Sequence, residues 1–333
     1  MIGLLNEAIP MPRKSSQSGF HEMQTTPLVL IAYNRPEKMR GLLERLREQR
    51  AENIIFAVDG PKINKPGDNA KVLAVQALVE SIDWTDKVET RFRETNMGLQ
   101  AAVTDAVTHA VSKYGRAIVL EDDTSPGPFW VPYAEAMLER HQGERKIEHI
   151  SGYNLVPDSV MANPGRGSRL SRYPESFAWA TWDRAWSQFD GTLDWGLNAS
   201  IADLVKIVGS RAGAMRWKQN FMDAEAGRIS SWAYRWISSM WSRGSFVLSP
   251  NANLVTYTGF DEGTHTVMKA PWNEIPQFEG TLESLTEGIV PILDESVDRW
   301  VGKTVFAETP YGVARGVAIS SALGIRKRYR ALR

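Results

Sequence analysis

The chain has 333 residues, enough to bury a substantial core as one large domain or as two fused lobes. Its 39 basic and 39 acidic residues balance, so no net field draws it to nucleic acid. The absence of cysteine excludes disulfides, thiolate catalysis and cysteine-based zinc sites, and the five histidines lack the spacing of a structural metal site.

The first 26 residues read as a polar leader ahead of the first apolar run. The sequence contains no stretch of about 18 apolar residues, so it predicts no membrane-spanning helix. Arg13 and Lys14 are not followed by the apolar core of a signal peptide. We therefore expect a cytoplasmic protein.

A strand, a helix and a second strand open the folded part. The uncharged run 28–33 predicts a strand buried on both faces. Pro36 suits the first turn of a helix, where its missing N–H is harmless, and apolar residues follow it at helical spacing. The run 54–58 predicts the next strand, which ends at Asp59.

The same alternation continues to residue 123. It predicts a helix over 70–82, a strand near a sheet edge over 88–93, a helix over 101–114 and a strand over 117–120. Strands that alternate with helices imply an α/β fold with a mostly parallel sheet, whose ligands bind outside the carboxyl ends of the strands. The polar residues after these strands should therefore gather on one edge: Asn34, Asp59, Glu121, Asp122 and Asp123.

Glu121, Asp122 and Asp123 form a carboxylate triplet at the end of an apolar strand. Buried like charges repel unless something neutralises them, and a divalent cation carrying a diphosphate does so. Mg²⁺ or Mn²⁺ then needs only one or two protein ligands. A solvated acidic loop explains the triplet alone equally well. Neither GxGxxG nor GxxxxGK[ST] is present, so a dinucleotide-binding or P-loop enzyme is not indicated.

Most of the 12 tryptophans follow residue 129. A large aromatic core accounts for most of them, although sugar rings also stack on aromatic planes. Trp182 and Trp186 are four residues apart and predict one face of a helix, with Trp179 just before it. A second buried helical stripe is predicted within residues 232–240.

Short strands are predicted at 245–250 and 254–257. They lead into a glycine-flanked segment, 258–266, whose composition alone is typical of a polar loop. The tail, 325–333, is strongly basic and is commonly a solvated, frayed terminus. Beside an anionic lipid surface, however, it would gain about 1 kcal/mol per charge, which suits peripheral contact with an inner membrane.

The order of the motifs over residues 27–268 resembles GT-A-fold glycosyltransferases. The likeness is greatest to the inverting N-acetylglucosaminyltransferase I type, whose metal motif is also Glu-Asp-Asp, and to bacterial sugar transferases related to it. The matching segments are 32–36, 58–60, 96–99 and 121–123. The resemblance implies a Mn²⁺- or Mg²⁺-dependent enzyme that moves a sugar from a nucleotide-sugar, most simply a UDP-sugar, to a glycan or lipid-linked acceptor with inversion.

The resemblance also implies roles for the matched residues. Asp123 would ligate the metal, Asp122 would lie by the ribose, and Glu121 would hydrogen-bond the donor sugar. Further donor-binding residues would be Asn34, Arg35, Asp59, Asn96, Trp179 and His265. Among these, Asp59 would accept from the base, Trp179 would line the sugar pocket, and His265 would belong to a lid over the donor.

The general base is left open by this resemblance. The resembling proteins often carry an aspartate in the Trp-rich segment, but the comparable positions here are Ser230 and Ala233. An inverting transfer needs a carboxylate to take the acceptor proton. The candidates are two acids on the lid and two acids before the Trp-rich helix: Glu262, Asp261, Asp223 and Glu225.

Four parts are predicted: a leader (1–26), a nucleotide-sugar half (27–150), an acceptor half with the lid (151–270) and an extension with the basic tail (271–333). Two other functions remain open. A nucleotidyltransferase that makes nucleotide-sugars shares the sheet and the metal but usually opens with a glycine-rich loop. A non-catalytic nucleotide- or glycan-binding member would explain the absence of an acid at residues 230 and 233.

Overall fold

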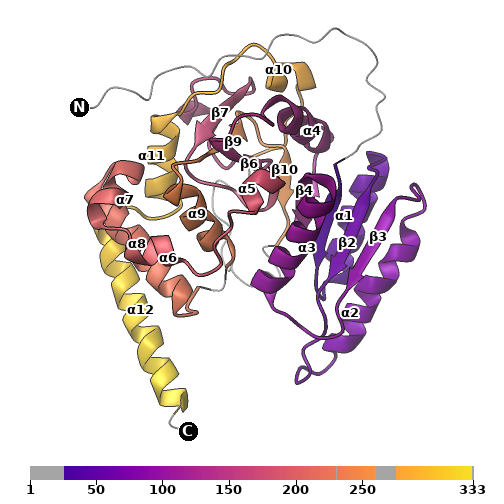
Figure 1. Ribbon diagram of the computed structural model, residues 1–333, viewed down its shortest axis with the longest axis horizontal. Helices are drawn as coiled ribbons and strands as arrows, with labels where there is room; N and C mark the ends of the chain where they lie inside the picture. Colours follow the sequence, from indigo (N-terminus) through magenta and orange to yellow (C-terminus); the bar gives the residue numbers. More distant parts are fainter. Residues whose placement is uncertain (1–25, 230, 260–274, 332–333) are drawn as a thin grey trace.

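The computed structural model describes residues 26–229, 231–259 and 275–331, with residues 321–331 described by their backbone (Figure 1). Within this part of the chain an eight-stranded sheet has the order β3-β2-β1-β4-β8-β6-β9-β7. All of its strands run in one direction except β8 and β7. The predicted α/β fold with a mostly parallel sheet is therefore confirmed.

The strands of this sheet are β1 (Leu28–Ala32), β2 (Ile54–Val58), β3 (Val88–Phe92), β4 (Arg116–Glu121), β6 (Ile147–Ser151), β7 (Ser168–Ser171), β8 (Ala178–Trp182) and β9 (Phe246–Pro250). A small antiparallel sheet pairs β5 (Thr124–Pro126) with β10 (Val255–Tyr257). The predicted strands match these bounds within one or two residues. Strand β3 is half-buried, as expected of a strand at the sheet edge.

The helices are α1 (Pro36–Glu48), α2 (Asp68–Ala77), α3 (Leu99–Tyr114), α4 (Trp130–Arg140), α5 (Asp183–Trp186), α6 (Asp194–Asn198), α7 (Ile201–Val208), α8 (Arg211–Glu225), α9 (Ala233–Ser242), α10 (Leu282–Thr286), α11 (Glu295–Thr304) and α12 (Pro310–Ala331). Short 3₁₀ turns follow α2 (Leu78–Ser81) and precede β7 (Asp158–Val160). Pro36 opens α1, as predicted. None of the helices in the described part is long and apolar enough to cross a membrane.

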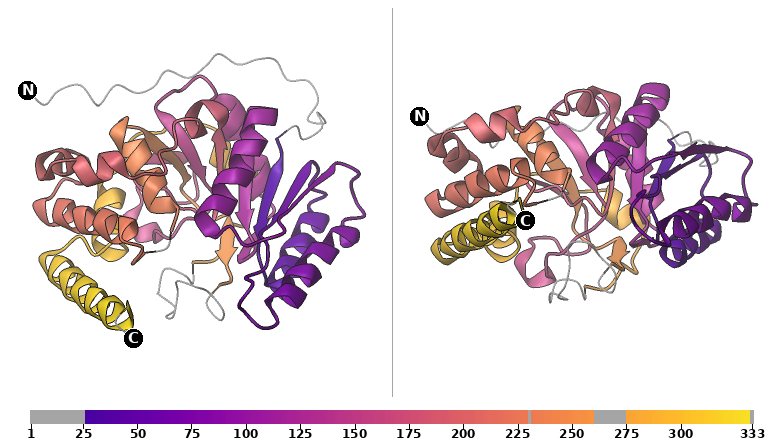
Figure 2. Two further views of the ribbon diagram at one scale, coloured as in Figure 1. Left: turned by 60° about the horizontal axis from the view of Figure 1, so that its bottom comes forward. Right: turned by 90° about the horizontal axis from the view of Figure 1, so that it is seen from below.

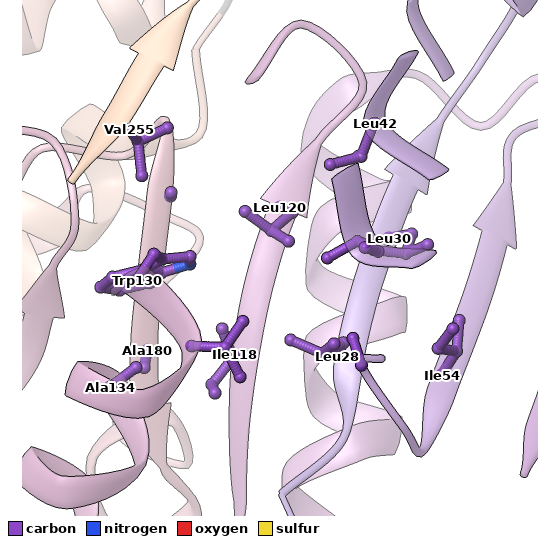
Figure 3. Close-up of a cluster of buried hydrophobic side chains, with 14 of the residues drawn as sticks. Leu28, Leu30, Leu42, Ile54, Ile118, Leu120, Trp130, Ala134, Ala180 and Val255 are labelled. Atoms are coloured by element: carbon purple, nitrogen blue, oxygen red, sulfur yellow. The ribbon is translucent and has the colours of Figure 1, made fainter. Parts of the chain in front are cut away.

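Side-chain alternation along the strands builds a core on each face of the sheet. On β4, Ile118 and Leu120 face the cluster that includes α1, α2 and α4, whereas Ala117 and Val119 face α3, α5 and α9. Figure 3 shows the first of these clusters, with Leu28 and Leu30 of β1 beside Ile118 and Leu120. Because Glu121 is odd-numbered like Val119, its side chain points to the face of α3 and α9.

The second half of the chain adds a helical lobe with an aromatic core, as the tryptophan content predicts. Trp217 packs on Trp241 at 4.6 Å and on Phe306 at 4.8 Å between ring centroids. Helix α12 packs along α8 at the outside of this lobe (Figure 2). Buried Glu308 accepts hydrogen bonds from Tyr173 and from Trp217 inside the core.

One expectation changes at β8. Trp182 is the last residue of this strand and not part of a helix shared with Trp186, because α5 begins only at Asp183. Strand β8 also lies between β4 and β6, so the predicted halves 27–150 and 151–270 share one continuous sheet. The spacing of four residues between Trp182 and Trp186 does not by itself distinguish a helix from a strand that leads into one.

Candidate functional site

Neighbouring parallel strands bring the predicted polar residues together. The central order β2-β1-β4 places the carboxyl ends of these strands side by side. We call this side of the sheet the carboxyl edge; β6 and β9 end there too. Arg35 follows β1 and reaches the acids after β4, where its Nη1 donates to Asp123 Oδ2 at 3.0 Å. It also donates to both carboxylate oxygens of Asp122.

The three acids, Glu121, Asp122 and Asp123, form what we call the acid cluster. Asp122 and Asp123 are buried, with exposed fractions of 2% and 7%. Burial, together with the charges of the two neighbouring aspartates, raises the pKa of Glu121 to about 8. Burial also raises the pKa of Asp122 to about 6, against the opposing pull of Arg35. The cluster is thus short of positive charge.

Trp232 holds Glu121 from the opposite side of the site. Its Nε1–H lies 3.5 Å from Glu121 Oε1, on the face that the β4 alternation predicts. The neighbouring residue, Ala233, begins α9. The Trp-rich segment that the resemblance singled out therefore borders the acid cluster, although Ser230 lies outside the described residues.

Asp123 fits a divalent cation. Its Oδ1 is buried, and no described residue gives it a hydrogen bond. A carboxylate oxygen is a hard ligand, which suits Mn²⁺ or Mg²⁺. No group of three or more His, Asp or Glu that could hold a metal occurs in the described part of the chain. A cation at Asp123 would therefore take most of its ligands from phosphate oxygens and water.

Asp59, after β2, is saturated with hydrogen bonds. Its Oδ1 accepts from the N–H of Gly60 at 2.9 Å and of Met97 at 2.8 Å. Its Oδ2 accepts from Asn96 Nδ2 at 2.8 Å and from the N–H of Gly98 at 3.1 Å. A carboxylate has about four acceptor positions, so none remains for a base in this conformation. Asp59 and Asn96 here shape the turn before α3.

The Asn34 side chain also hydrogen-bonds within the protein, to an aspartate that no sequence motif indicated. Buried Asp68, the first residue of α2, accepts from Asn34 Nδ2 at 2.5 Å, from Tyr33 Oη, and from the N–H of Lys62 at 2.8 Å. Lys65 Nζ lies 3.0 Å from it. Although burial opposes the shift, these donors hold the pKa of Asp68 well below its usual range. An acid at the start of a helix after a glycine was the only sequence signal.

A small cavity at the carboxyl edge lies beside Asp59. Its polar lining includes Arg91, Arg93 and Asp105, and Arg91 Nη2 donates to both oxygens of Asp105. Arg93 pairs with the same carboxylate. Two arginines at i and i+2 share one face of a strand, and that spacing could have indicated them.

Trp179 lies in the core in the described conformation. Its exposed fraction is 0%, and its ring stacks on His149 at 5.2 Å and packs on Trp232 at 5.0 Å. The ring therefore supports Trp232 from behind and presents no surface to a sugar.

The two candidate bases that the structure describes, Asp223 and Glu225, each lie beside an arginine. Asp223 accepts from Arg228 Nε at 2.6 Å and from Ser320 Oγ, which ties α8 to α12. Glu225 lies 3.6 Å from Arg235 and is half exposed. Asp261 and Glu262 lie outside the described residues, as do His265 and most of the predicted lid.

No family model matches the chain, and no curated protein matches it. Similar solved structures include the mannosyltransferase PcManGT from Pyrobaculum calidifontis in complex with GDP-Man and Mn²⁺, at 12% identity and a TM-score of 0.40, covering 94% of this chain and 84% of that one. HddC from Yersinia pseudotuberculosis has 12% identity and a TM-score of 0.29, covering 47% and 76%. The bifunctional glycosyltransferase WbbM has 10% identity and a TM-score of 0.35, covering 70% and 39%. At these values they do not establish the function of this chain.

Proposed function

We propose that this protein is a metal-dependent, inverting glycosyltransferase. Its donor would be a nucleotide-sugar, in first place a UDP-sugar, and its acceptor a glycan or a lipid-linked sugar. The observation that carries the proposal is the acid cluster at the carboxyl edge, where buried Asp123 keeps one carboxylate oxygen without a hydrogen bond among the described residues. The basic tail, residues 325–333, of which the structure describes 325–331 as the end of α12, favours the lipid-linked class of acceptor.

Asp123 would hold Mn²⁺ or Mg²⁺, which offsets the charge of the departing diphosphate when bound. The chain's own residues then divide the donor between them. Arg35 reaches across from β1 and would hold the nucleotide, while Asp122 would lie by the ribose. Glu121, oriented by Trp232, would hydrogen-bond the sugar. Donor orientation in this arrangement comes from rigid strand ends, which favours a precise reaction geometry.

Calorimetric titration of UDP, with and without Mn²⁺, tests the proposal. Wild type should bind UDP more tightly with Mn²⁺, and Asp123→Ala should lose this dependence with an affinity about 100-fold lower. Asp83→Ala is the matched control, because Asp83 is an exposed aspartate that pairs only with Arg47 in the described structure. It should behave as wild type. Equal UDP affinity in wild type and Asp123→Ala, with and without Mn²⁺, would refute the metal assignment.

A nucleotide-sugar-binding protein without turnover is the second candidate. Ala233 favours it, because this residue borders the acid cluster through Trp232 and has no group that could take a proton. Nucleotide release from a panel of UDP-, GDP- and dTDP-sugars with Mn²⁺ separates the two candidates. Release from at least one donor supports an enzyme, whereas tight binding without release supports the second candidate.

A further inference from the structure

We infer that Glu175, in the loop between β7 and β8, is the general base of the proposed transfer. The inference rests on the proposed function and adds a residue that no sequence motif indicated. It also removes the need for an acid at Ala233.

The register of the sheet puts Glu175 on the same edge as the acid cluster. Strand β8 runs antiparallel to β4, with Ala178 opposite Leu120. Asp123 follows Leu120 by three residues, and Glu175 precedes Ala178 by three, so both leave the sheet at the carboxyl edge. Adjacent strands are about 4.8 Å apart. Strand β1, which precedes Arg35, pairs with the other side of β4. A sugar at the acid cluster would have the nucleotide residues on one side and Glu175 on the other.

Three aromatic residues connect Glu175 with Asp123. The ring of Phe177 lies 4.3 Å from that of Tyr257 and 5.1 Å from that of Tyr153. A Cβ on Gly259 would lie 2.4 Å from the Tyr257 hydroxyl and 2.9 Å from Asp123 Oδ2, so these two oxygens are neighbours. Tyr153 interacts electrostatically with both Glu175 and Tyr257. Such a group offers apolar faces on which an acceptor sugar could pack.

The backbone of Glu175 is fixed by β6. Its N–H donates to Ser151 Oγ at 3.2 Å, and its carbonyl oxygen lies 3.2 Å from His149 Nε2. Trp236 Nε1 donates to His149 Nδ1 at 3.2 Å, so the imidazole carries its proton on Nε2 and donates a hydrogen bond to the Glu175 carbonyl oxygen. Burial lowers the pKa of His149 to about 3, which keeps this ring neutral.

The carboxylate of Glu175, in contrast, receives no hydrogen bond from any residue that the structure describes. The titratable groups that face it are Arg169 of β7 and Tyr153 after β6. Burial raises the pKa of Glu175 to about 8, against the opposing charge of Arg169, yet the residue keeps part of its surface open to solvent. Once ionised, a deep but reachable carboxylate without donors is a stronger proton acceptor than an ordinary glutamate.

The step balances with this residue as base. The acceptor hydroxyl oxygen bonds to the anomeric carbon, while the bond from that carbon to the diphosphate oxygen breaks and its electron pair leaves with the nucleotide. Glu175 takes the hydroxyl proton and becomes a neutral acid. Water in place of the acceptor gives hydrolysis of the donor by the same step.

The competing role for Glu175 is that of a counter-charge for buried Arg169. That role and the catalytic role differ in the stability of Glu175→Gln. A carboxyl whose pKa is raised by burial costs stability as pH rises from about 4.5 to 8, since ionisation is disfavoured in the folded state. If Glu175 is a base without donors, the Glu175→Gln variant should melt at the same or a higher temperature than wild type at pH 8. If Glu175 is instead a counter-charge that Arg169 needs, the variant should melt at a lower temperature than wild type at pH 8.

The decisive assay is nucleotide release from the donor panel with Mn²⁺, with water or azide as the acceptor. Glu175→Gln should release nucleotide 10²- to 10⁴-fold more slowly than wild type with water, while its calorimetric affinity for UDP and Mn²⁺ stays unchanged. Azide has no proton to lose and should restore release. Wild type should also speed up with pH to a plateau above about 8. Glu308→Gln, another buried glutamate whose Oε1 hydrogen bonds glutamine can keep, is the control and should release nucleotide as wild type does.

Release by Glu175→Gln at the wild-type rate, or a loss that azide does not restore, would overturn the assignment of the base while leaving the proposed function intact. Absence of release by wild type with every donor would overturn the proposed function and the inference with it. A lower melting temperature of Glu175→Gln at pH 8 would support the counter-charge role and reject the base.

Discussion

Carboxylates on the two sides of the carboxyl edge have opposite hydrogen-bonding surroundings. On the side of β1 and β2, Asp59 and Asp68 are surrounded by donors, and each accepts from side chains and from the backbone. On the side of β8 and β6, Glu175 has a fixed backbone and a carboxylate that none of the described residues hydrogen-bonds. Filled acceptors stabilise a turn and set its shape, whereas an unfilled acceptor is available for chemistry. In the proposed reaction, Arg35 on the first side would hold the nucleotide, and Glu175 on the second side would take the proton.

Among the variants of this comparison, Asp59→Ala should cause the largest loss of folding stability. Four hydrogen bonds disappear, and the N–H groups of Met97 and Gly98 lose their acceptor. We expect a loss of about 4 kcal/mol in the free energy of unfolding, measured by urea denaturation. Asp59→Asn keeps one acceptor oxygen and should lose about half as much. Asp83→Ala, which removes an exposed ion pair with Arg47, should lose less than about 1 kcal/mol. Equal losses in Asp59→Ala and Asp83→Ala would contradict a structural role for Asp59.

Asp68→Asn should lower the free energy of unfolding by about 2 kcal/mol at neutral pH. The size of this loss should depend on pH. The folded-state pKa of Asp68 lies below its unfolded value, so its contribution is complete above about pH 5 and is lost as pH falls through 4 and below. The difference in unfolding free energy between wild type and variant should shrink from pH 6 to pH 3. A difference that stays constant over this range would show that the charge of Asp68 is not what stabilises the fold.

Ser151→Ala, on the side of Glu175, should have the smallest effect on stability of the three variants. The N–H of Glu175 loses its acceptor, which costs about 1 kcal/mol. Nucleotide release should fall several-fold, because the loop that carries Glu175 is less well held, while affinity for UDP with Mn²⁺ stays unchanged. Ser242→Ala provides a control, since Ser242 Oγ donates only to a carbonyl within α9. A fall in nucleotide affinity in Ser151→Ala would assign this residue to nucleotide binding instead.

Local sequence determined the strands and helices of the first half and the residues at their ends. Unbroken apolar runs produced strands β1, β2 and β4, which are buried on both faces, and Pro36 set the start of α1. Since parallel neighbours expose their carboxyl ends on one side, the sequence by itself placed Arg35 and the acid cluster together.

Only the tertiary structure decided the acceptor side. Whether residues 178–182 form a strand depends on pairing with β4 and β6, because their continuous burial leaves no alternation to read. That pairing puts Glu175 on the carboxyl edge, where its backbone contacts His149 and Ser151. The tertiary structure also shows that donors from the turn before α3 occupy the acceptor positions of the Asp59 carboxylate. Contacts between residues far apart in the chain depend on register and packing, and no local pattern of residue types carries that information.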